Sequence, residues 1–417
     1  MGNLRAGVSK VNITPYVGIW LCGFGARFKP SENVYDDLYA RAIVFDDGNE
    51  NLAMVTCDLL TLDESSIESV RKMAQDMTGL KGENILISTT HTHSGPLSGH
   101  LRGFGPLDNA WVNILEKKIA GAIAVAFRNM QDVSIGAGKG QASINMNRRG
   151  GKAIDREIGI IRVNCNNGKP LAVIMNYPCH PVIVPWDLHT ISADYPGVAS
   201  KVIEKAYDGA IGMFFTGTCG NINPVAVCRD LDTVKRLGTI VGAEALKVSE
   251  EITSFESDVN LKATKEKVIL KSQEIPPAEQ LQEIVNAGSK ASNPVLDWEY
   301  NWAKDALEYA KAGKISADIP VEIQVLALSD KIAVAGIPGE VFVEIGLAIR
   351  EKSPFEFMLT IECANGCIGY MPVREAFDEG GYEPALAFKL FGIYPVDKDV
   401  AEKVINSAVR MAHDLKN

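Results

Sequence analysis

Apolar and polar residues follow one another along this chain with two periods, one typical of strands and one typical of helices. Short apolar runs rich in β-branched residues predict buried strands. We expect strands at 52–58, 84–90, 133–147, 157–164, 170–177, 211–216, 321–328 and 331–335. Apolar residues spaced three or four apart predict helices at 61–79, 109–129, 195–208, 232–252, 340–351 and 398–415. This mixture predicts an α/β fold in which layered sheets are flanked by helices.

The first of these helices carries signals at both ends. Thr61 is followed three residues later by Glu64, which predicts a capping box at its start. Gly79 predicts its end, because glycine is favoured just after a helix.

Residues 276–314 differ in character from the rest of the chain. The stretch is polar and helix-prone, and Trp298 and Trp302 are four residues apart, which places both rings on one helix face. We expect a helical insertion, either packed against the main domain or forming a lid or a wall that faces the substrate. There is no internal repeat and no linker rich in Pro, Gly or Ser, so residues 1–417 are predicted to be one domain with this insertion.

Charge and composition exclude several classes of function. The chain has 417 residues with 42 Lys+Arg and 52 Asp+Glu, a formal charge of −10, which argues against binding nucleic acid by phosphate neutralisation. No apolar stretch reaches the roughly 18 residues of a spanning helix. The first six residues lack the apolar core of a signal peptide, and the eight scattered cysteines include no C-x-x-C pair. We therefore expect a cytoplasmic protein with reduced thiols.

Histidines at two strand ends are the first candidates for chemistry. His91 and His93 follow the strand at 84–90, and in an extended segment both would face one side. An H-x-H pair commonly presents imidazoles to zinc, although local hydrogen bonds explain such a pair equally well. His180 follows the strand at 170–177, where a lone histidine is more often hydrogen-bonded to the backbone.

A carboxylate completes the candidate set. Glu340 stands at the predicted start of a helix, where the helix dipole alone also accounts for it, and Glu344 competes one turn later. Two histidines and a glutamate at strand ends suit a catalytic zinc ion that keeps one position open for water. Cys219, on a glycine-containing loop, is an alternative nucleophile for which the sequence indicates no partner. No G-x-S-x-G, Walker or G-x-G-x-x-G motif follows a strand, so metal-assisted hydrolysis is favoured.

These residues resemble the neutral/alkaline non-lysosomal ceramidase family. His91-Thr92-His93-Ser94-Gly95-Pro96 resembles its HTHSGP signature. Other landmarks follow in the family's order: Asn147-Arg148, Asp155-Arg156-Glu157, Ile191-Ser192-Ala193-Asp194, Gly220-Asn221-Ile222-Asn223-Pro224 and Pro338-Gly339-Glu340. Near the C-terminus, Tyr370 is followed twelve residues later by Tyr382-Glu383, which is similar to the spacing between the family's tyrosine zinc ligand and its second tyrosine.

The resemblance implies a fold, a cofactor and a mechanism. The fold is of the α/β/β/α type, and the cofactor is Zn2+ held by His91, His180, Glu340 and Tyr370. Zinc-bound hydroxide would attack an amide or ester carbonyl. His93, Arg148 and Tyr382 would move protons and stabilise the tetrahedral intermediate. Arg148 has a simpler alternative as an ordinary surface arginine next to Arg149.

Departures from the family bear on the substrate. The chain ends soon after Tyr382, where the family continues into a β-rich domain, and it lacks the glycine run after Pro96. No amphipathic lipid-packing helix is present. We therefore predict a small-molecule or lipid-like acylated substrate, with a soluble acylated sugar, amino-acid amide or ester as the alternative to a ceramide-like lipid. A non-catalytic relative that kept the site is a third possibility, and the oligomeric state is left open.

Overall fold

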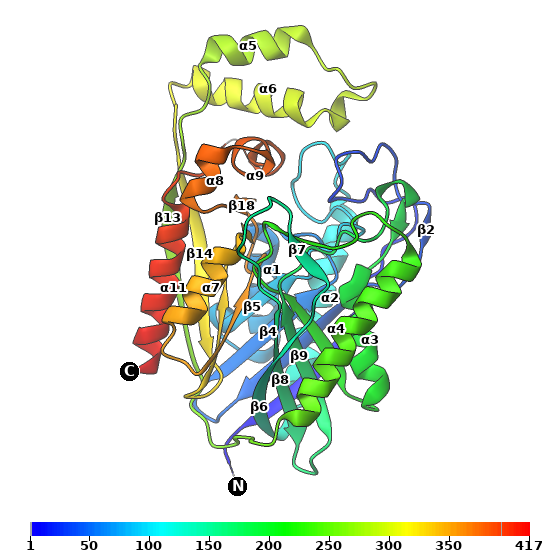
Figure 1. Cartoon of the computed structure of the whole chain (residues 1–417), viewed down its shortest axis with the longest axis vertical. Coiled ribbons are helices and arrows are strands. Elements are labelled where there is room, and N and C mark those ends of the chain that lie inside the picture. The colour runs from blue at the N-terminus through cyan, green and yellow to red at the C-terminus, as the bar shows by residue number, and fades with distance from the viewer. Residues whose placement is uncertain (1, 393) are drawn as a thin grey trace.

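An eight-stranded mixed sheet forms the centre of the molecule (Figure 1). The computed structural model describes residues 2–392 and 394–417. The strand order is β11-β9-β8-β6-β1-β3-β4-β5. The bounds are β1 Arg5–Asn12, β3 Tyr39–Asp46, β4 Asn51–Cys57, β5 Ile85–Thr89, β6 Gln131–Gln141, β8 Glu157–Cys165, β9 Pro170–Tyr177 and β11 Ile211–Thr216.

A second sheet of four strands and three short strand pairs complete the β-structure. The order in the second sheet is β13-β14-β15-β17. Its strands are β13 Lys262–Lys271, β14 Asp318–Ala327, β15 Ile332–Gly336 and β17 Phe357–Ile361. The pairs are β2 Asn33–Val34 with β10 Thr190–Ile191, β7 Asn145–Asn147 with β12 Ile222–Pro224, and β16 Glu340–Val341 with β18 Tyr370–Met371.

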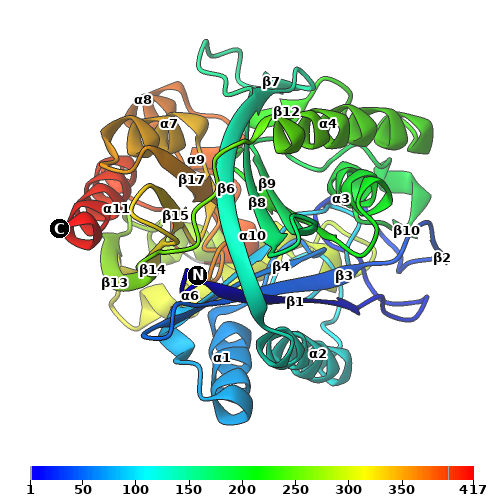
Figure 2. The same cartoon turned by 90° about the horizontal axis from the view of Figure 1, so that it is seen from below.

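Helices cover the outer faces of both sheets, as Figure 2 shows from below. Those against the large sheet are α1 Glu64–Thr78, α2 Asn109–Arg128, α3 Asp194–Ala206 and α4 Leu231–Glu251. Those against the second sheet are α7 Val343–Lys352 and α11 Val400–Lys416. Short helices follow β18: α8 Arg374–Glu379, α9 Tyr382–Ala385 and α10 Phe388–Phe391. Single 3-10 turns lie at Gly82–Asn84, Trp186–Leu188 and Pro294–Leu296.

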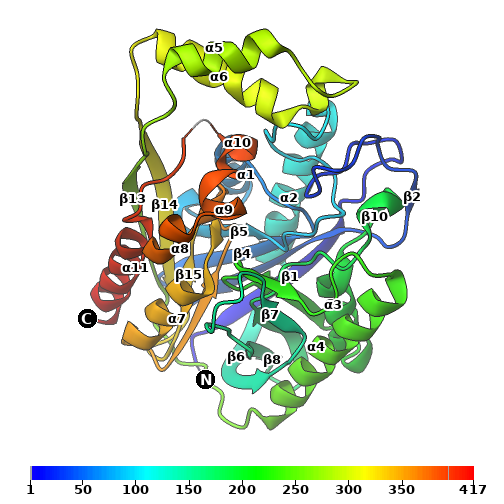
Figure 3. The ribbon, with the colours of Figure 1, turned by 45° about the horizontal axis from the view of Figure 1, so that its top comes forward.

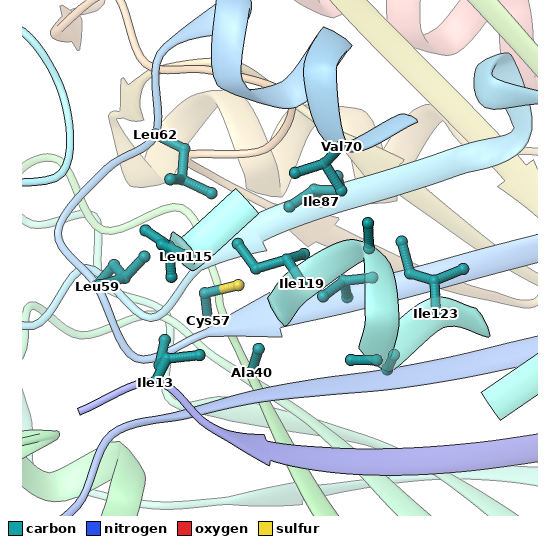
Figure 4. Packing of buried hydrophobic residues seen from close by; sticks show 14 of the residues in the cluster. Ile13, Ala40, Cys57, Leu59, Leu62, Val70, Ile87, Leu115, Ile119 and Ile123 are labelled. Atoms are coloured by element: carbon teal, nitrogen blue, oxygen red, sulfur yellow. The ribbon is translucent and has the colours of Figure 1, made fainter. Parts of the chain in front are cut away.

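The hydrophobic core is divided into layers by the sheets. Ile43 of β3, Leu326 of β14 and Leu359 of β17 belong to the layer between the two sheets. Another layer lies between the large sheet and its helices, where Ile119 of α2 lies beside Cys57 of β4 and Ile123 belongs to the same cluster (Figure 4). Because both faces of these strands are buried, their sequences are almost continuously apolar. The predicted α/β fold of layered sheets flanked by helices is confirmed.

Two predicted element boundaries are wrong for reasons of pairing. The strand expected at 133–147 ends at Gln141, because β7 pairs with β12 and not with a strand of the large sheet. The helix expected at 340–351 begins at Val343, whose N–H is bound by the side chain of Asn221 at 2.9 Å. Glu340 lies in β16 instead, where it pairs with Tyr370 of β18.

The predicted capping box is also wrong. Helix α1 begins at Glu64 with Asp63 at the N-cap, and no side chain caps it. The Asp63 carboxylate is turned away from the helix and accepts the backbone N–H of His100 at 3.1 Å. The Thr61 hydroxyl interacts with the Leu62 carbonyl at 3.5 Å. Gly79 ends the helix with a φ of 79°, as predicted.

The polar stretch after residue 276 forms two helices, α5 Ala278–Ala287 and α6 Trp298–Lys311, in the connection between β13 and β14. Figure 3 shows the pair at one end of the molecule, above α10. Trp298 and Trp302 share a face, since both rings contact the ammonium group of Lys389 at 5.8 and 4.5 Å from their centroids. The helical insertion is confirmed. Among the described residues, no helix is long and apolar enough to span a membrane.

Candidate metal centre

Four chain segments that are distant in sequence meet at one edge of the sheets. His91 comes two residues after β5, and His180 three residues after β9. Glu340 and Tyr370 lie opposite each other on the paired strands β16 and β18, and the Glu340 N–H donates to the Gly369 carbonyl at 2.9 Å. The structure therefore brings together all four predicted metal ligands.

His91 and His180 are held in the same way. His91 Nδ1 lies 2.9 Å from the Leu60 carbonyl oxygen, and His180 Nδ1 lies 2.7 Å from that of Cys219. A carbonyl only accepts, so each Nδ1 donates its hydrogen, and in the neutral form of each ring Nε2 carries the lone pair. This arrangement is typical of metal-binding histidines, whose second nitrogen is fixed by a backbone carbonyl.

The two free nitrogens face the same carboxylate oxygen. Glu340 Oε2 lies 3.3 Å from His91 Nε2 and 3.0 Å from His180 Nε2. All three side chains are at most 3% exposed. Burial favours a neutral Glu340, but the two histidines outweigh it and hold the pKa of this carboxyl well below its usual range. Burial opposes a charged His91, yet Glu340 raises the pKa of this imidazole to about 9. A bound cation has to displace that proton.

His93 lies beside the pair. Its ring centroid is 5.0 Å from that of His91 and 5.7 Å from that of His180. Nitrogen atoms of the three rings all lie within 4.8 Å of one another. Burial, and then its two histidine neighbours, lower the pKa of His93 well below its usual value, so its imidazole is neutral near pH 7. The structure thus places His93 where it can bind a metal as a third histidine or transfer a proton.

The donors fit a metal ion. His91 Nε2 and both ring nitrogens of His93 are buried and have no hydrogen-bond partner within residues 2–392 and 394–417. Buried polar atoms without partners are rare in folded proteins, and a cation shared between them removes the penalty. Imidazole nitrogens combined with a carboxylate oxygen are ligands that suit zinc.

The pairing of His91 with His93 has a different cause from the predicted one. His91 has a φ of 63°, in the left-handed region, so the segment is not extended at this point. The rings meet because the chain turns, and Arg27 fixes this turn by donating from Nη1 to the His93 carbonyl at 2.5 Å. Gly23 is required next to it, since a Cβ there would lie 2.6 Å from the His93 ring.

Tyr370, Arg148 and Tyr382 surround the carboxylate side of the site. The Arg148 guanidinium carbon lies 5.3 Å from the Tyr370 ring centroid, and the rings of Tyr370 and Tyr382 are 5.7 Å apart. Burial raises the pKa of Tyr370 far above its usual value in spite of Arg148. A phenolate at this position therefore needs a further positive charge, such as a metal ion.

Arg148 is mostly buried beside Tyr370 and is not an ordinary surface arginine. Its Nε donates to Glu383 Oε1 at 2.8 Å, and its Nη2 donates to the Gly220 carbonyl at 2.8 Å. Glu383 is 5% exposed and also accepts from Arg149 at 2.7 Å. Glu383 thus fixes Arg148 from the short helix α9, which begins at Tyr382.

A pocket opens beside the histidines, and we call it the metal-site pocket. His91, His93, Glu340, Tyr370 and Tyr382 line one side of it. Apolar residues also line it: Leu60, Leu101, Phe104, Leu390 and Phe391. The space between these atoms is about 280 Å³. No sequence signal marks the apolar side, because leucine and phenylalanine in loops are read as ordinary core residues.

Two candidates from the sequence are not part of the pocket. Glu344 accepts a hydrogen bond from the side chain of Asn221 at 2.9 Å and faces a different groove. Cys219 is fully buried, and burial raises the pKa of its thiol well above the usual value, which makes it a poor nucleophile. Its Sγ donates to Glu362 Oε1 at 2.9 Å.

Glu362 is a buried carboxyl that the sequence analysis does not single out. Its Oε2 accepts the backbone N–H groups of Cys219 at 2.9 Å and Val341 at 3.0 Å. It therefore joins the loop that holds His180 to the strand that carries Glu340. Burial raises the pKa of Glu362 to about 7. A charged residue directly after the apolar strand β17 is the one sequence signal that points to it.

We expect Glu362→Gln to change how stability depends on pH. The folded-state pKa lies above the ordinary 4.5, so the carboxyl's contribution is complete below about pH 4.5 and is lost as the pH rises through about 7. The variant's neutral amide has no carboxylate to keep buried at high pH. The free energy of unfolding of the metal-free variant, minus that of wild type, should therefore be about 3 kcal/mol larger at pH 8 than at pH 4. Denaturant unfolding at both pH values measures this difference. The exposed Glu356 supplies the control variant Glu356→Gln, and equal pH profiles for Glu362→Gln and wild type would refute the prediction.

Comparison with known proteins identifies the family of this chain. The sequence profile described as "Neutral/alkaline non-lysosomal ceramidase, N-terminal" matches residues 4–235, more than half of the chain. The chain belongs to this ceramidase family. Neutral ceramidase B of Dictyostelium discoideum is 26% identical over 265 residues, covering 53% of this chain and 35% of that protein. Neutral ceramidase A of the same organism is 29% identical over 203 residues, covering 43% and 28%. The chain thus spans about a third of the length of these ceramidases.

Two solved ceramidase structures share the fold of the whole chain. The neutral ceramidase from Pseudomonas aeruginosa superposes with a TM-score of 0.79 at 19% identity, covering 100% of this chain and 75% of that one. A structure described as "Ceramidase complexed with C2" gives a TM-score of 0.81 at 18% identity, covering 100% and 76%. The family and the fold predicted from the histidine signature and the tyrosine spacing are confirmed. The roles assigned to single residues stay predictions.

Proposed function

We propose that this chain is a zinc-dependent hydrolase that cleaves the carbon–nitrogen bond of an N-acyl amide. One observation carries the proposal: two buried imidazoles, each with Nδ1 fixed by a backbone carbonyl, turn their Nε2 atoms to one buried carboxylate. Membership of the ceramidase family supports the amide as the bond that is cleaved.

His91, His180, Glu340 and Tyr370 would hold the metal. Their nitrogen and oxygen donors suit zinc better than calcium or magnesium, which prefer oxygen ligands alone. When bound, zinc lowers the pKa of a water molecule and polarises a carbonyl. Tyr370 would bind as a phenolate, and the neighbouring positive charge of Arg148 supports its ionisation.

The other polar residues would act on the substrate. Neutral His93 accepts a proton from the attacking water and passes it to the departing nitrogen. Arg148, which Glu383 and the Gly220 carbonyl hold in place, donates toward the oxygen that becomes negative as the carbonyl carbon turns tetrahedral. The hydroxyl of Tyr382 is a second donor on the same side. Water thereby adds across the C–N bond, and the products are a carboxylate and an amine.

The substrate is proposed to be a small or lipid-like acylated molecule. Apolar side chains in the lining of the metal-site pocket favour an acyl group over a sugar there. The pocket is compact, so a soluble N-acyl or O-acyl compound with a short chain is the second candidate substrate.

Turnover on a matched panel tests the function. Protein depleted of metal and then loaded with zinc should hydrolyse N-acyl amides, and the metal-free protein should not. The panel contains short-chain and long-chain ceramides, N-acyl amino acids, N-acyl sugars and the corresponding O-acyl esters. Ester cleavage without amide cleavage would select the second candidate. Stoichiometric zinc with no turnover on any compound would indicate a binding protein and contradict the proposal.

A further inference from the structure

Two side chains line both the metal-site pocket and a second cavity. Leu101 and Phe391 line the metal-site pocket and also line a larger space, which we call the outer groove, together with Leu97, Leu107 and Asp305. The outer groove holds about 640 Å³, part of it open to solvent. The metal-site pocket, at about 280 Å³ and also partly open to solvent, is less than half as large.

Several polar contacts hold Leu101 in place between the two spaces. Leu101 is 9% exposed, and the next residue, Arg102, donates its backbone N–H to the Leu390 carbonyl at 3.0 Å. The guanidinium of Arg102 contacts Asp305 of α6 through Nε and Nη2, at 2.9 and 2.8 Å. The loop that carries Leu101 is therefore tied both to α10 and to the helical insertion.

Phe391 is fixed from the other side. Its ring lies against Gly369, the residue before Tyr370, where a Cβ would approach the ring to 2.9 Å. The ring of Phe388, one turn earlier on α10, packs edge-on against Trp302 with centroids 5.9 Å apart. The tryptophans of the insertion thus pack against α10 and do not line the metal-site pocket.

The residues that line the metal-site pocket differ in polarity. Tyr382 is 44% exposed, so an amine or a head group bound beside it can reach solvent. Leu101, Phe104 and Phe391 are apolar, so an acyl chain bound with its carbonyl at the histidines packs against them. A chain longer than the pocket would have to displace one of these side chains.

We propose that Leu101 and Phe391 form a partition that restricts the acyl group of the substrate to a few carbons. This inference rests on the proposed function, whose site it uses. Removing either side chain joins the metal-site pocket to the outer groove, where Leu97 and Leu107 offer apolar surface to a longer chain. Each additional methylene that is then buried is worth up to about fourfold in kcat/KM.

An acyl-length series tests the partition in the zinc-loaded full chain. The substrates carry acetyl to dodecanoyl groups on one common amine, and the variants are Phe391→Ala and Leu101→Ala. Wild type should prefer acyl groups of two to four carbons, and both variants should raise the decanoyl-to-acetyl ratio of kcat/KM at least tenfold. Leu107→Ala is the matched control, because Leu107 lines the outer groove only. Its profile should follow wild type, and thermal melting checks that every variant is folded.

A binding measurement separates failure of the partition from failure of the proposed function. Calorimetry with acetate to dodecanoate, the carboxylate products of the series, needs no turnover. Wild type should bind the short carboxylates better, and Phe391→Ala should bind decanoate at least tenfold more tightly than wild type does. If the protein shows this binding pattern but hydrolyses none of the substrates, the proposed function is overturned and the partition is not. A wild-type profile that is flat in chain length, or unchanged in both variants, overturns the partition alone.

Discussion

His180→Ala is expected to lose bound zinc and hydrolytic activity together. The imidazole is completely buried, its Nδ1 is held by the Cys219 carbonyl, and its Nε2 lies 3.0 Å from Glu340. Loss of a residue that only orients a ligand weakens metal binding about 10–100-fold, so loss of a ligand should exceed 100-fold. Metal analysis of the purified protein, together with kcat/KM on the best substrate of the panel, measures both effects.

A histidine on the surface gives the control for this experiment. His413→Ala changes an exposed position on the C-terminal helix and should keep both zinc and activity. His180→Gln keeps a side chain of similar length and guards against a cavity that unfolds the protein. Undiminished zinc in both His180 variants would exclude the predicted ligand set.

His93→Ala is expected to keep its bound zinc and to have a much lower kcat. General acid–base catalysis by one side chain typically contributes about 10²–10⁴-fold, so kcat should fall by that factor. Burial and the two neighbouring histidines lower the pKa of His93, and a neutral imidazole is the form that accepts a proton at pH 7. Added imidazole should restore part of the rate, because the alanine leaves a space of the same shape.

The same variant distinguishes the two roles that the structure allows for His93. The nitrogens of His91, His93 and His180 lie within 4.8 Å of one another, so a site of three histidines is geometrically possible. Zinc content is the deciding measurement. Loss of zinc in His93→Ala comparable to that in His180→Ala would make His93 a ligand and remove it from proton transfer.

Local sequence patterns predicted much of the fold. The bounds of β9 and β11 match the expected ranges 170–177 and 211–216, because buried strands between turn residues read as short apolar runs. β13 gave no such signal, since this edge strand carries several lysines and buries only Val268 and Leu270. The start of α7 was misplaced because Glu340 pairs with a strand thirty residues later, which local propensity does not register.

Some residues of the candidate site also had a local sequence signal, and others did not. His91, His93 and His180 could be found because histidines are few and stand directly after apolar strands. Tyr370 and Tyr382 came from resemblance to the ceramidase family, since a tyrosine in isolation carries no sign of metal binding. Glu362 and the apolar side of the metal-site pocket had no comparable signal.

The sequence by itself determined the α/β class and the family, and it predicted candidate metal ligands, because these depend on local periodicity and on rare residue types at short spacing. Only the tertiary structure decided that Glu340 faces both His91 and His180, that His91 reaches His93 through a turn, and that Leu101 and Phe391 line the pocket. These contacts join segments up to about 300 residues apart in the printed sequence. Such contacts arise from how the sheets, the insertion and α10 pack, and no local pattern encodes them.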